Sequence, residues 1–236
     1  MPASGQLDFA RLDALTFDCY GTLIDWETGL AEAFRPLLRA HGIEADDEDV
    51  LAHYARHEAE AEAGPYLPYR EVLAAGLRGA AAELGFAPTS EEVGAFSGSG
   101  ADWRPFPDSA AGLARLHERF RLGVITNCDD DLFAASSTRL GTEFDWVVTA
   151  QQAGAYKPDP RPFLLAFERL GLPLEQILHV AQSRYHDHGQ ARRLGLVSVW
   201  IDRRHGRAGS GATPDADFTP DATFPDLASF AAAATS

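Results

Sequence analysis

The apolar and polar residues of this chain follow two different periods, and the change between them divides the sequence into parts. Residues 14–17 form a short apolar run that ends at Asp18, which is the pattern of a buried strand. Gly21 and Thr22 then break the pattern, and apolar residues return at helical spacing. Three predicted helices follow one another with no strand between them, over residues 28–41, 47–62 and 69–84.

Beyond these helices the pattern changes to an alternation of helix and strand. The predicted helices cover residues 109–120, 132–140, 160–170 and 189–194, and the predicted strands cover residues 122–126, 146–149, 177–181 and 197–201. Alternation of this kind predicts a parallel, doubly wound sheet. The Gly- and Ser-rich residues 94–102 predict a hinge before this region, and residues 206–225, rich in Gly, Pro, Asp and Thr, predict a surface loop.

This order of elements predicts an α/β protein, with a doubly wound, parallel-sheet (Rossmann-like) core and an all-helical cap inserted after the first strand. We place the core in residues 1–25 and 103–236 and the cap in residues 26–102. An insertion at this point lies over the carboxyl edge of the sheet, which is where open α/β sheets bind ligands. A helical cap there can exclude water from a site and move on a hinge.

Composition and charge exclude several classes of protein. The chain has 236 residues, of which 45% are apolar, enough for a large core in one or two domains. A net charge of −15 and a pI near 4.8 argue against nucleic-acid binding, which needs a basic surface. No apolar run reaches the roughly 18 residues of a membrane span, and residues 1–7 lack the basic and apolar parts of a signal peptide. We therefore expect a cytoplasmic protein with neither a nucleic-acid nor a membrane partner.

Two residue types are rare enough to be informative. The two cysteines, Cys19 and Cys128, are too few for a disulfide framework and have no zinc-site spacing, so we expect both to be small packing residues. Lys157 is the single lysine among 20 basic residues. Lysine offers a compact point charge where arginine offers a wide fork, so Lys157 is a candidate for a role that arginine does not fill, with chance as the alternative.

Four polar clusters follow strands or the turns after them. They are residues 18–22, Thr126 with Asn127, Lys157 with Pro158, and residues 183–187. Because the carboxyl ends of parallel strands meet at one edge of a sheet, we expect these clusters to converge on one crevice. A carboxylate, a hydroxyl, an amide and an ammonium would meet there, which is the composition of a site built around a nucleophile.

These clusters, in this order, resemble the four motifs of the haloacid dehalogenase superfamily of hydrolases. Residues 17–23 (FDCYGTL) are similar to the first motif, whose leading aspartate, here Asp18, is the nucleophile. Thr126-Asn127 resembles the second motif, residues 156–159 (YKPD) the third, and residues 183–187 the fourth. The resemblance covers almost the whole chain and implies the same fold of core and cap.

The first motif also distinguishes branches of that superfamily. Its phosphatases carry a second aspartate two residues after the nucleophile, which protonates the leaving oxygen in a loop that helps to hold magnesium; this chain has Tyr20 there. A phenol with a pKa of about 10 is a poor acid at pH 7, and Mg²⁺ prefers carboxylate and water oxygens. Residues 18–22 resemble instead the metal-independent L-2-haloacid dehalogenases, and residues 15–29 are also similar to azetidine-2-carboxylate hydrolases. We therefore expect neither a metal nor another cofactor.

The chemistry that these residues allow is a two-step hydrolysis. An ionised Asp18 attacks the carbon that bears a halide and forms an aspartyl ester, and water then attacks the ester carbonyl and releases a hydroxy acid. Burial raises the pKa of a carboxyl group, and the ammonium of Lys157 opposes that rise. We expect the substrate to be a short 2-substituted carboxylic acid with a halide as the leaving group. A ring nitrogen as the leaving group is the alternative, and a phosphatase with unusual metal binding is a less favoured third reading.

The catalytic candidates are Asp18 as the nucleophile, Lys157 as its counter-charge, Thr22 as a donor to a carboxylate, and Asp187. Asp187 pairs with Lys157 or orients the hydrolytic water. His186 or His188 is a candidate for an added base, because an imidazole titrates near neutral pH. A metal site at residues 186–188 is disfavoured, since residues i and i+2 point apart on a helix.

The binding candidates come mainly from the resemblance. It implies that the backbone N–H groups of Cys19 and Tyr20 hold the substrate carboxylate, that Asn127 contacts the leaving halide, and that a halide-binding arginine lies at Arg56. A solvated surface position is the alternative for Arg56. The remaining candidates are Thr126, Ser183 and His186. Relatives in this branch are often dimers, so a homodimer is one expected assembly.

The fourth motif departs from the dehalogenase pattern, which is a Ser-Ser-Asn run followed by an aromatic residue and Asp. Ala181 stands at the first serine and Ser183 at the asparagine, with one extra residue before Asp187. The nucleophile is unaffected by these changes. They concern the residues that would serve the second, hydrolytic step and the choice of substrate.

Overall fold

The core of the protein is a parallel sheet of six strands in the order β3-β2-β1-β4-β5-β6. The computed structural model describes residues 7–205, 213, 216 and 218–236. The strands are β1 (Ala14–Phe17), β2 (Arg121–Thr126), β3 (Trp146–Thr149), β4 (Ile177–Ala181), β5 (Val197–Ile201) and β6 (Ala222–Phe224). The order runs outward from β1 in both directions, so the predicted doubly wound α/β fold is confirmed.

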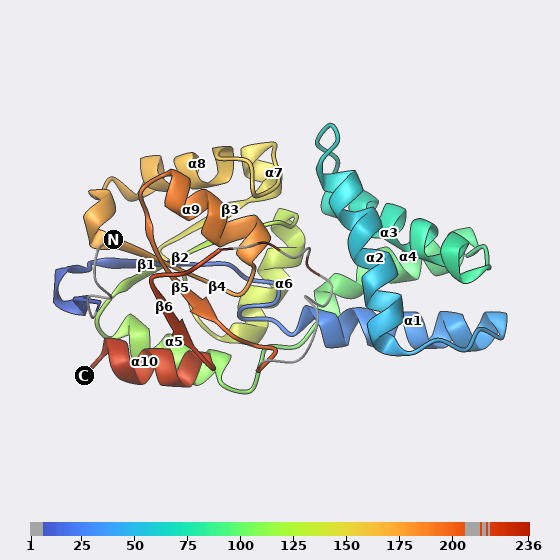
Figure 1. Cartoon of the computed structure of the whole chain (residues 1–236), viewed down its shortest axis with the longest axis horizontal. Coiled ribbons are helices and arrows are strands. Elements are labelled where there is room, and N and C mark those ends of the chain that lie inside the picture. The colour runs from blue at the N-terminus through green and yellow to red at the C-terminus, as the bar shows by residue number, and fades with distance from the viewer. Residues whose placement is uncertain (1–6, 206–212, 214–215, 217) are drawn as a thin grey trace.

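Helices cover both faces of this sheet (Figure 1). One face carries α8 (Arg161–Leu170) and α9 (Gly189–Arg193), and the other carries α5 (Ser109–His117) and α10 (Leu227–Ala234). The other helical elements of the core are α6 (Asp130–Leu140), α7 (Ala150–Ala153), and the short turns η1 (Phe9–Arg11), η3 (Leu174–Gln176) and η4 (Arg184–His188). Among the helices of the described residues, none is long and apolar enough to span a lipid bilayer.

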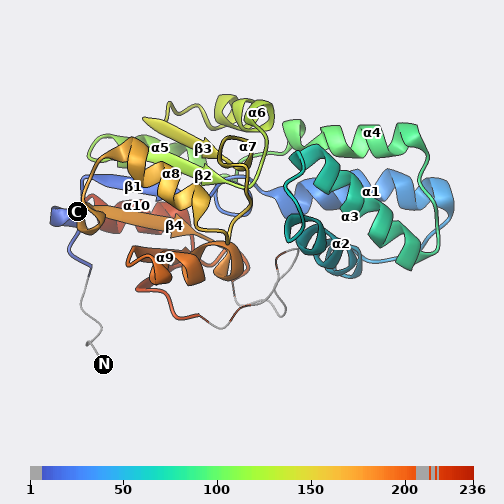
Figure 2. The same ribbon diagram turned by 90° about the horizontal axis from the view of Figure 1, so that it is seen from above.

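A cap made only of helices lies where the strands of the core end (Figure 2). It consists of α1 (Trp26–His41), α2 (Asp47–Glu62), α3 (Tyr69–Leu84) and α4 (Ser90–Gly98), followed by the turn η2 (Ser99–Asp102). The chain enters the cap after the turn that follows β1 and returns to the core before α5. The cap therefore covers the carboxyl edge of the sheet, as the order of elements predicts.

The hinge predicted over residues 94–102 is wrong, because this stretch is helical as α4 and η2. Thr89 caps α4: its hydroxyl accepts the N–H of Glu92 at 3.2 Å, and the Glu92 carboxylate accepts the N–H of Thr89 at 2.7 Å. Val93 and Phe96 are buried in the cap. Capping and burial together outweigh the low helix propensity of the Gly and Ser residues.

The surface loop predicted over residues 206–225 is wrong at its end. Residues 222–224 form β6, which pairs with β5, and the unpredicted helix α10 follows with Asp226 as its N-cap residue. A strand of three residues gives too short a pattern to be recognised in the sequence. Residues 206–212, 214, 215 and 217 of the predicted loop lie outside the described residues, as do residues 1–6.

Gly123 in β2 shows how closely side chains pack on the surface of the sheet, because its register partner in β3 is Trp146. A Cβ atom on Gly123 would lie 1.9 Å from Cε2 of Trp146, so the indole ring lies directly against the glycine backbone. We predict that Gly123→Ala lowers the free energy of unfolding by about 1–3 kcal/mol, because the ring or the strand must shift.

Gly94→Ala is the matched control. Gly94 lies in α4 and has no atom within 4 Å of a new Cβ, so this substitution should raise the free energy of unfolding by about 0.5–1 kcal/mol. Urea unfolding measures both variants. Similar effects of the two substitutions would contradict the close packing at Gly123.

Candidate active site

Asp18 lies directly after β1, at the centre of the carboxyl edge of the sheet. Its N–H donates to the carbonyl of Val180 in β4 at 3.1 Å, which extends the sheet pairing by one residue. The chain then turns sharply, and the N–H of Leu23 donates to the carbonyl of Cys19 at 2.8 Å. Gly21 within this turn has a φ of +89°, a conformation that residues with a side chain rarely adopt. The turn holds Asp18 at the sheet edge and directs the chain into the cap.

Both oxygens of the Asp18 carboxylate accept a hydrogen bond. Oδ1 accepts from Nζ of Lys157 at 2.8 Å, and Oδ2 accepts from the hydroxyl of Thr22 at 2.6 Å. One donor to each oxygen is the pattern of an ionised carboxylate, and each oxygen keeps a further lone pair. Asp18 is only 5% exposed, yet it borders a pocket. The carboxylate is thus oriented, largely shielded from water and placed at the edge of the pocket.

The ammonium of Lys157 lies between two buried carboxylates. It donates to Oδ1 of Asp18 at 2.8 Å, to Oδ1 of Asp187 at 2.7 Å, and to the carbonyl of Ile125 in β2 at 2.8 Å. These contacts use all three N–H donors of the ammonium. Of the two roles that the sequence allows for Asp187, the pairing with Lys157 is present in the structure.

The protonation of this cluster depends on a competition between burial and ion pairing. Burial acts to lower the pKa of Lys157, but the charges of Asp18 and Asp187 outweigh it and raise that pKa above its ordinary value. Burial acts to raise the pKa of Asp187, yet Lys157 and His179 hold it well below its usual range. For Asp18, burial prevails over the attraction of Lys157, so the pKa of this carboxyl is raised. As the pH falls, Asp18 therefore takes up a proton before Asp187 does.

His179 in β4 is a member of the cluster that the sequence did not reveal. Its Nε2 lies 2.9 Å from Oδ1 of Asp187, and its Nδ1 lies 2.8 Å from the hydroxyl of Thr16, its register partner in β1. The ring is fully buried. A histidine within an apolar strand is the only signal for this role in the sequence. In the fold it orients the carboxylate that in turn holds Lys157.

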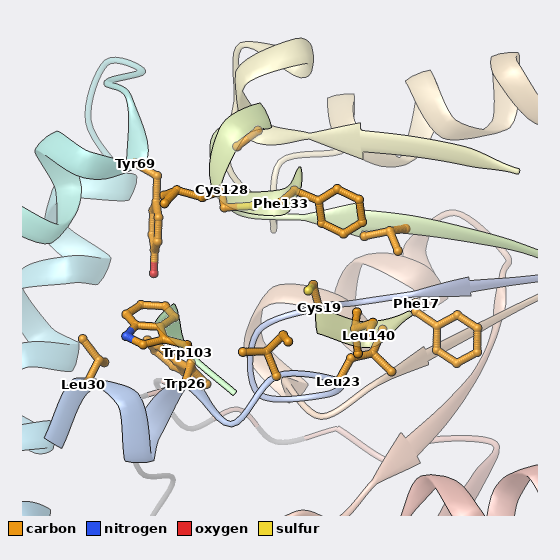
Figure 3. Packing of buried hydrophobic residues seen from close by; sticks show 14 of the residues in the cluster. Phe17, Cys19, Leu23, Trp26, Leu30, Tyr69, Trp103, Cys128, Phe133 and Leu140 are labelled. Carbon is orange, nitrogen blue, oxygen red and sulfur yellow. The ribbon is translucent and has the colours of Figure 1, made fainter. Parts of the chain in front are cut away.

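A small pocket of about 30 Å³ separates this cluster from the cap. The core contributes Asp18, Tyr20, Asn127, Lys157, Ser183, His186 and Thr213, and the cap contributes Trp26, Glu58, Glu62 and Tyr69. Figure 3 shows Tyr69 reaching from the cap toward Trp26 and Trp103, close to the turn after β1. A larger hollow of about 350 Å³ beside Arg203 and Arg204 does not contain the nucleophile, so the smaller pocket is the candidate site.

Most residues predicted for the site come together here. Asp18, Tyr20, Asn127, Lys157, Ser183 and His186 border the pocket, and Thr22 and Asp187 contact its charged groups. Thr126 does not border it; the hydroxyl of Thr126 lies 3.5 Å from Sγ of Cys128. The side chains of Cys19 and Cys128 are fully buried in the core, as expected of packing residues.

The amide of Asn127 joins the core to the cap. Its Nδ2 donates to Oε1 of Glu62 at 3.2 Å and to the carbonyl of Lys157 at 3.1 Å, while its Oδ1 accepts the N–H of Lys157 at 2.8 Å. Both amide N–H groups therefore have partners. To contact a leaving halide, Asn127 would have to give up its hydrogen bond to Glu62 or to the carbonyl of Lys157.

Arg56 lies outside the pocket, contrary to the prediction that it binds a halide. Its guanidinium pairs with Glu83, and its side chain is 53% exposed. Glu58 and Glu62 are four residues apart on α2, so they lie on the same face of the helix and both border the pocket. Arg56 is two positions before Glu58 and therefore faces another direction. These two glutamates are not among the residues predicted for the site, although their spacing of four residues on a predicted helix is a signal that they share a face.

The two candidate histidines have different surroundings. His186 borders the pocket with its Nε2 3.2 Å from Oε2 of Glu62; burial acts to lower the pKa of His186, but Glu62 outweighs it and raises that pKa. His188 is buried away from the pocket, between the hydroxyl of Ser198 and the carbonyl of Ala181, and burial lowers its pKa to about 4. Only His186 is placed to exchange a proton with a bound molecule.

Known proteins resemble this chain in sequence and in fold. A family model described as haloacid dehalogenase-like hydrolase matches residues 12–181, and the chain belongs to this family. It is 26% identical over 205 residues to an (S)-2-haloacid dehalogenase of Pseudomonas fluorescens, covering 83% of this chain and 87% of the relative. It is 31% identical over 173 residues to a phosphoserine phosphatase of Thermus thermophilus, covering 71% of this chain and 68% of the relative.

A solved structure also matches. The L-2-haloacid dehalogenase from Xanthobacter autotrophicus superposes with a TM-score of 0.78 over 94% of this chain and 97% of the other, at 22% identity. This likeness shows that the two chains share the fold of core and cap.

The donor set of the site does not fit the magnesium that the superfamily's phosphatases use. Mg²⁺ needs hard oxygen ligands in near-octahedral geometry. Here the ammonium of Lys157 lies between Asp18 and Asp187 and binds Oδ1 of each, and Tyr20 offers a phenol in place of a second carboxylate. Within the described part of the chain, no group of three or more His, Cys, Asp or Glu side chains is arranged to hold a metal.

We predict that Lys157→Met lowers the free energy of unfolding at pH 7 by about 3–5 kcal/mol, because it leaves Asp18 and Asp187 buried without a counter-charge. The lowered pKa of Asp187 stabilises the wild type above the ordinary carboxyl pKa, and this contribution is lost as the pH falls through the lowered value. That loss occurs below pH 4. In the variant, burial without a counter-charge raises the pKa of both carboxyl groups, so they take up protons as the pH falls, and the difference between the two proteins should narrow toward about pH 4.

Urea unfolding at both pH values measures this difference. Arg35→Met is the control, because it breaks an exposed ion pair with Asp47 and should change stability by at most about 1 kcal/mol. A Lys157→Met effect as small as that of the control would show that the buried pairs do not stabilise the fold.

Proposed function

We propose that the chain is a metal-independent hydrolase of short 2-substituted carboxylic acids that removes a halide by nucleophilic attack of Asp18. The observation that carries this proposal is the Asp18 carboxylate, held by Lys157 and Thr22 and bordering the pocket. Tyr20 stands where a proton donor for a leaving oxygen would be needed, and burial raises the pKa of its phenol well above the ordinary value. A halide leaves as an anion and needs no proton. The haloacid dehalogenase relatives support the same reaction.

In the first step, a lone pair of the Asp18 carboxylate attacks C2 of the acid from the side opposite the halide. The new C–O bond forms as the carbon–halogen bond breaks, and the halide leaves with the bonding electrons. Because Asp18 is almost fully buried, little water solvates the carboxylate. Lys157 stays charged throughout and fixes the direction of attack.

In the second step, water adds to the carbonyl carbon of the Asp18 ester. The bond between this carbon and the ester oxygen breaks, the hydroxy acid leaves with one proton of the water, and the other proton passes to solvent. The Asp18 carboxylate is restored with one oxygen from water. Attack at the ester carbonyl, rather than at the carbon of the acid, is the feature that isotope labelling can detect.

A specific observation favours a second candidate, the opening of a C–N ring. His186 borders the pocket, and Glu62 raises the pKa of its imidazole, which favours the charged form. A charged imidazole can donate a proton to a departing nitrogen, which a halide does not need. The attack by Asp18 is the same in both candidates. A phosphatase is less favoured, despite the phosphoserine phosphatase relative, because the donor set does not fit magnesium.

We predict that the protein releases chloride from (S)-2-chloropropionate in the presence of EDTA. A single turnover in ¹⁸O-labelled water should place the label in the Asp18 peptide, and rapid quenching should trap an Asp18 ester, both read by mass spectrometry. Asp18→Ala should reduce the rate by more than about 10³-fold. Ring opening of azetidine-2-carboxylate without chloride release would select the second candidate. Magnesium-dependent phosphate release from an aryl phosphate would reject both.

We also predict that Lys157→Arg lowers kcat by about 10²-fold or more, although it keeps the positive charge. The planar fork of arginine cannot place three N–H groups where the compact ammonium places them, so the carboxylate of Asp18 must move. Steady-state kinetics on the substrate identified above measures the effect, and circular dichroism checks that the variant is folded. Near-normal kcat would show that charge alone suffices at this position.

A further inference from the structure

The wall of the pocket that the cap provides contains two buried carboxyl groups. Glu58 is only 4% exposed, and its Oε1 accepts the hydroxyls of Tyr54 at 3.0 Å and Tyr69 at 2.8 Å. Its Oε2 accepts no hydrogen bond from any residue that the structure describes. Glu62, one helical turn later, is 7% exposed and also borders the pocket. One carboxylate oxygen of this wall, on a residue that borders the pocket, therefore lacks a donor among the described residues.

Among the described residues that line the pocket, no lysine or arginine is free to pair with an anionic group. Lys157 is the only lysine or arginine among the described residues that line it, and its three N–H donors are already used. Arg56, expected to provide a further positive charge, lies outside. Nε2 of His186 lies 3.2 Å from Oε2 of Glu62. An anionic group placed beside Glu58 would lie close to the charge of Glu62, which is unfavourable in a buried setting.

The other walls of the pocket are suited to a cation. Tyr20, Trp26 and Tyr69 line it, and the rings of Tyr20 and Tyr69 lie with centroids 6.1 Å apart. The faces of aromatic rings attract cations, most strongly where water is excluded. Figure 3 shows Trp26 and Tyr69 converging from the two sides of the junction between cap and core. Carboxylates and aromatic faces together form a setting for an organic cation with N–H donors.

We infer, on the basis of the proposed function, that Glu58 and Glu62 form a subsite for a protonated amine, so that the substrate is a short carboxylic acid that also carries an ammonium group. The ammonium N–H groups donate to Oε2 of Glu58 and to the carboxylate of Glu62. Asp18 lines the same pocket, so a molecule held in this way lies within reach of the nucleophile. The two glutamates select the substrate, and the core cluster carries out the reaction.

The protonation of Glu58 provides an independent readout. The groups that face it are Tyr54 and Glu62 on α2, Tyr69 on α3 and His186 of the core. Burial and the charge of Glu62 raise the pKa of Glu58 to about 8, so this group is mostly protonated at pH 7 in the empty pocket. An ammonium favours the ionised form, so its binding should release a proton from Glu58.

L-alanine and propionate form a matched pair of probes, because they share a carbon skeleton and differ in the 2-ammonium group. Calorimetric titration of the whole protein at pH 7 should show at least tenfold tighter binding of L-alanine. Titration in two buffers of different ionisation enthalpy should show proton release with L-alanine. Glu58→Gln should abolish the proton release, and Glu58→Gln and Glu62→Gln should each reduce the preference for L-alanine by at least fivefold.

Glu60→Gln is the control, because Glu60 lies on the same helix with a side chain 74% exposed and should leave both readouts unchanged. Equal or tighter binding of propionate by the wild type would overturn the ammonium subsite, and so would an undiminished preference in both glutamate variants. If a variant does not fold, the preference and proton release of the wild type still decide the question. Trapping of an Asp18 ester tests the proposed hydrolysis separately, so either conclusion can fail without the other.

Discussion

The ammonium of Lys157 holds together the edge of the sheet at which the chemistry is proposed to occur. It contacts Asp18 after β1, the carbonyl of Ile125 in β2, and Asp187 in the turn after β4. Two carboxylates buried this close would repel each other strongly without a cation between them. Three acceptors from three directions suit the tetrahedral, compact ammonium and not a planar guanidinium. This geometry gives a physical reason for the single lysine in a chain that otherwise uses arginine.

Further polar contacts connect the cluster around Lys157 to the central strands of the sheet. Thr16 in β1 supports His179 in β4, and His179 supports Asp187, so register partners on adjacent central strands orient the carboxylate that holds Lys157. Thr22 holds the other oxygen of Asp18. Asp18 is thus positioned by groups at the ends of the central strands.

The cap and the core carry charge in different ways. In the core, Lys157 offsets one of the two carboxylates that it contacts. In the cap, Glu58 shares one oxygen with two tyrosines and has no basic partner among the described residues. Relatives named as a phosphatase and as a dehalogenase both match this chain, which has Tyr20 in the turn after Asp18 and two glutamates in the wall of the pocket that the cap provides.

The order of apolar and polar segments was enough to predict the doubly wound core, the inserted cap and the convergence of Asp18, Lys157 and Asp187, because strand ends in a parallel sheet must meet at one edge. Residues 94–102 and β6 were missed, since capping by Thr89 and pairing with β5 override weak local propensities. The inward face of α2 was also missed: helical spacing groups Glu58 with Glu62 but does not say which side packs on the core. Side-chain direction on the cap, and with it the charge of the pocket, depends on contacts between segments far apart in the chain, and only folding brings those segments together.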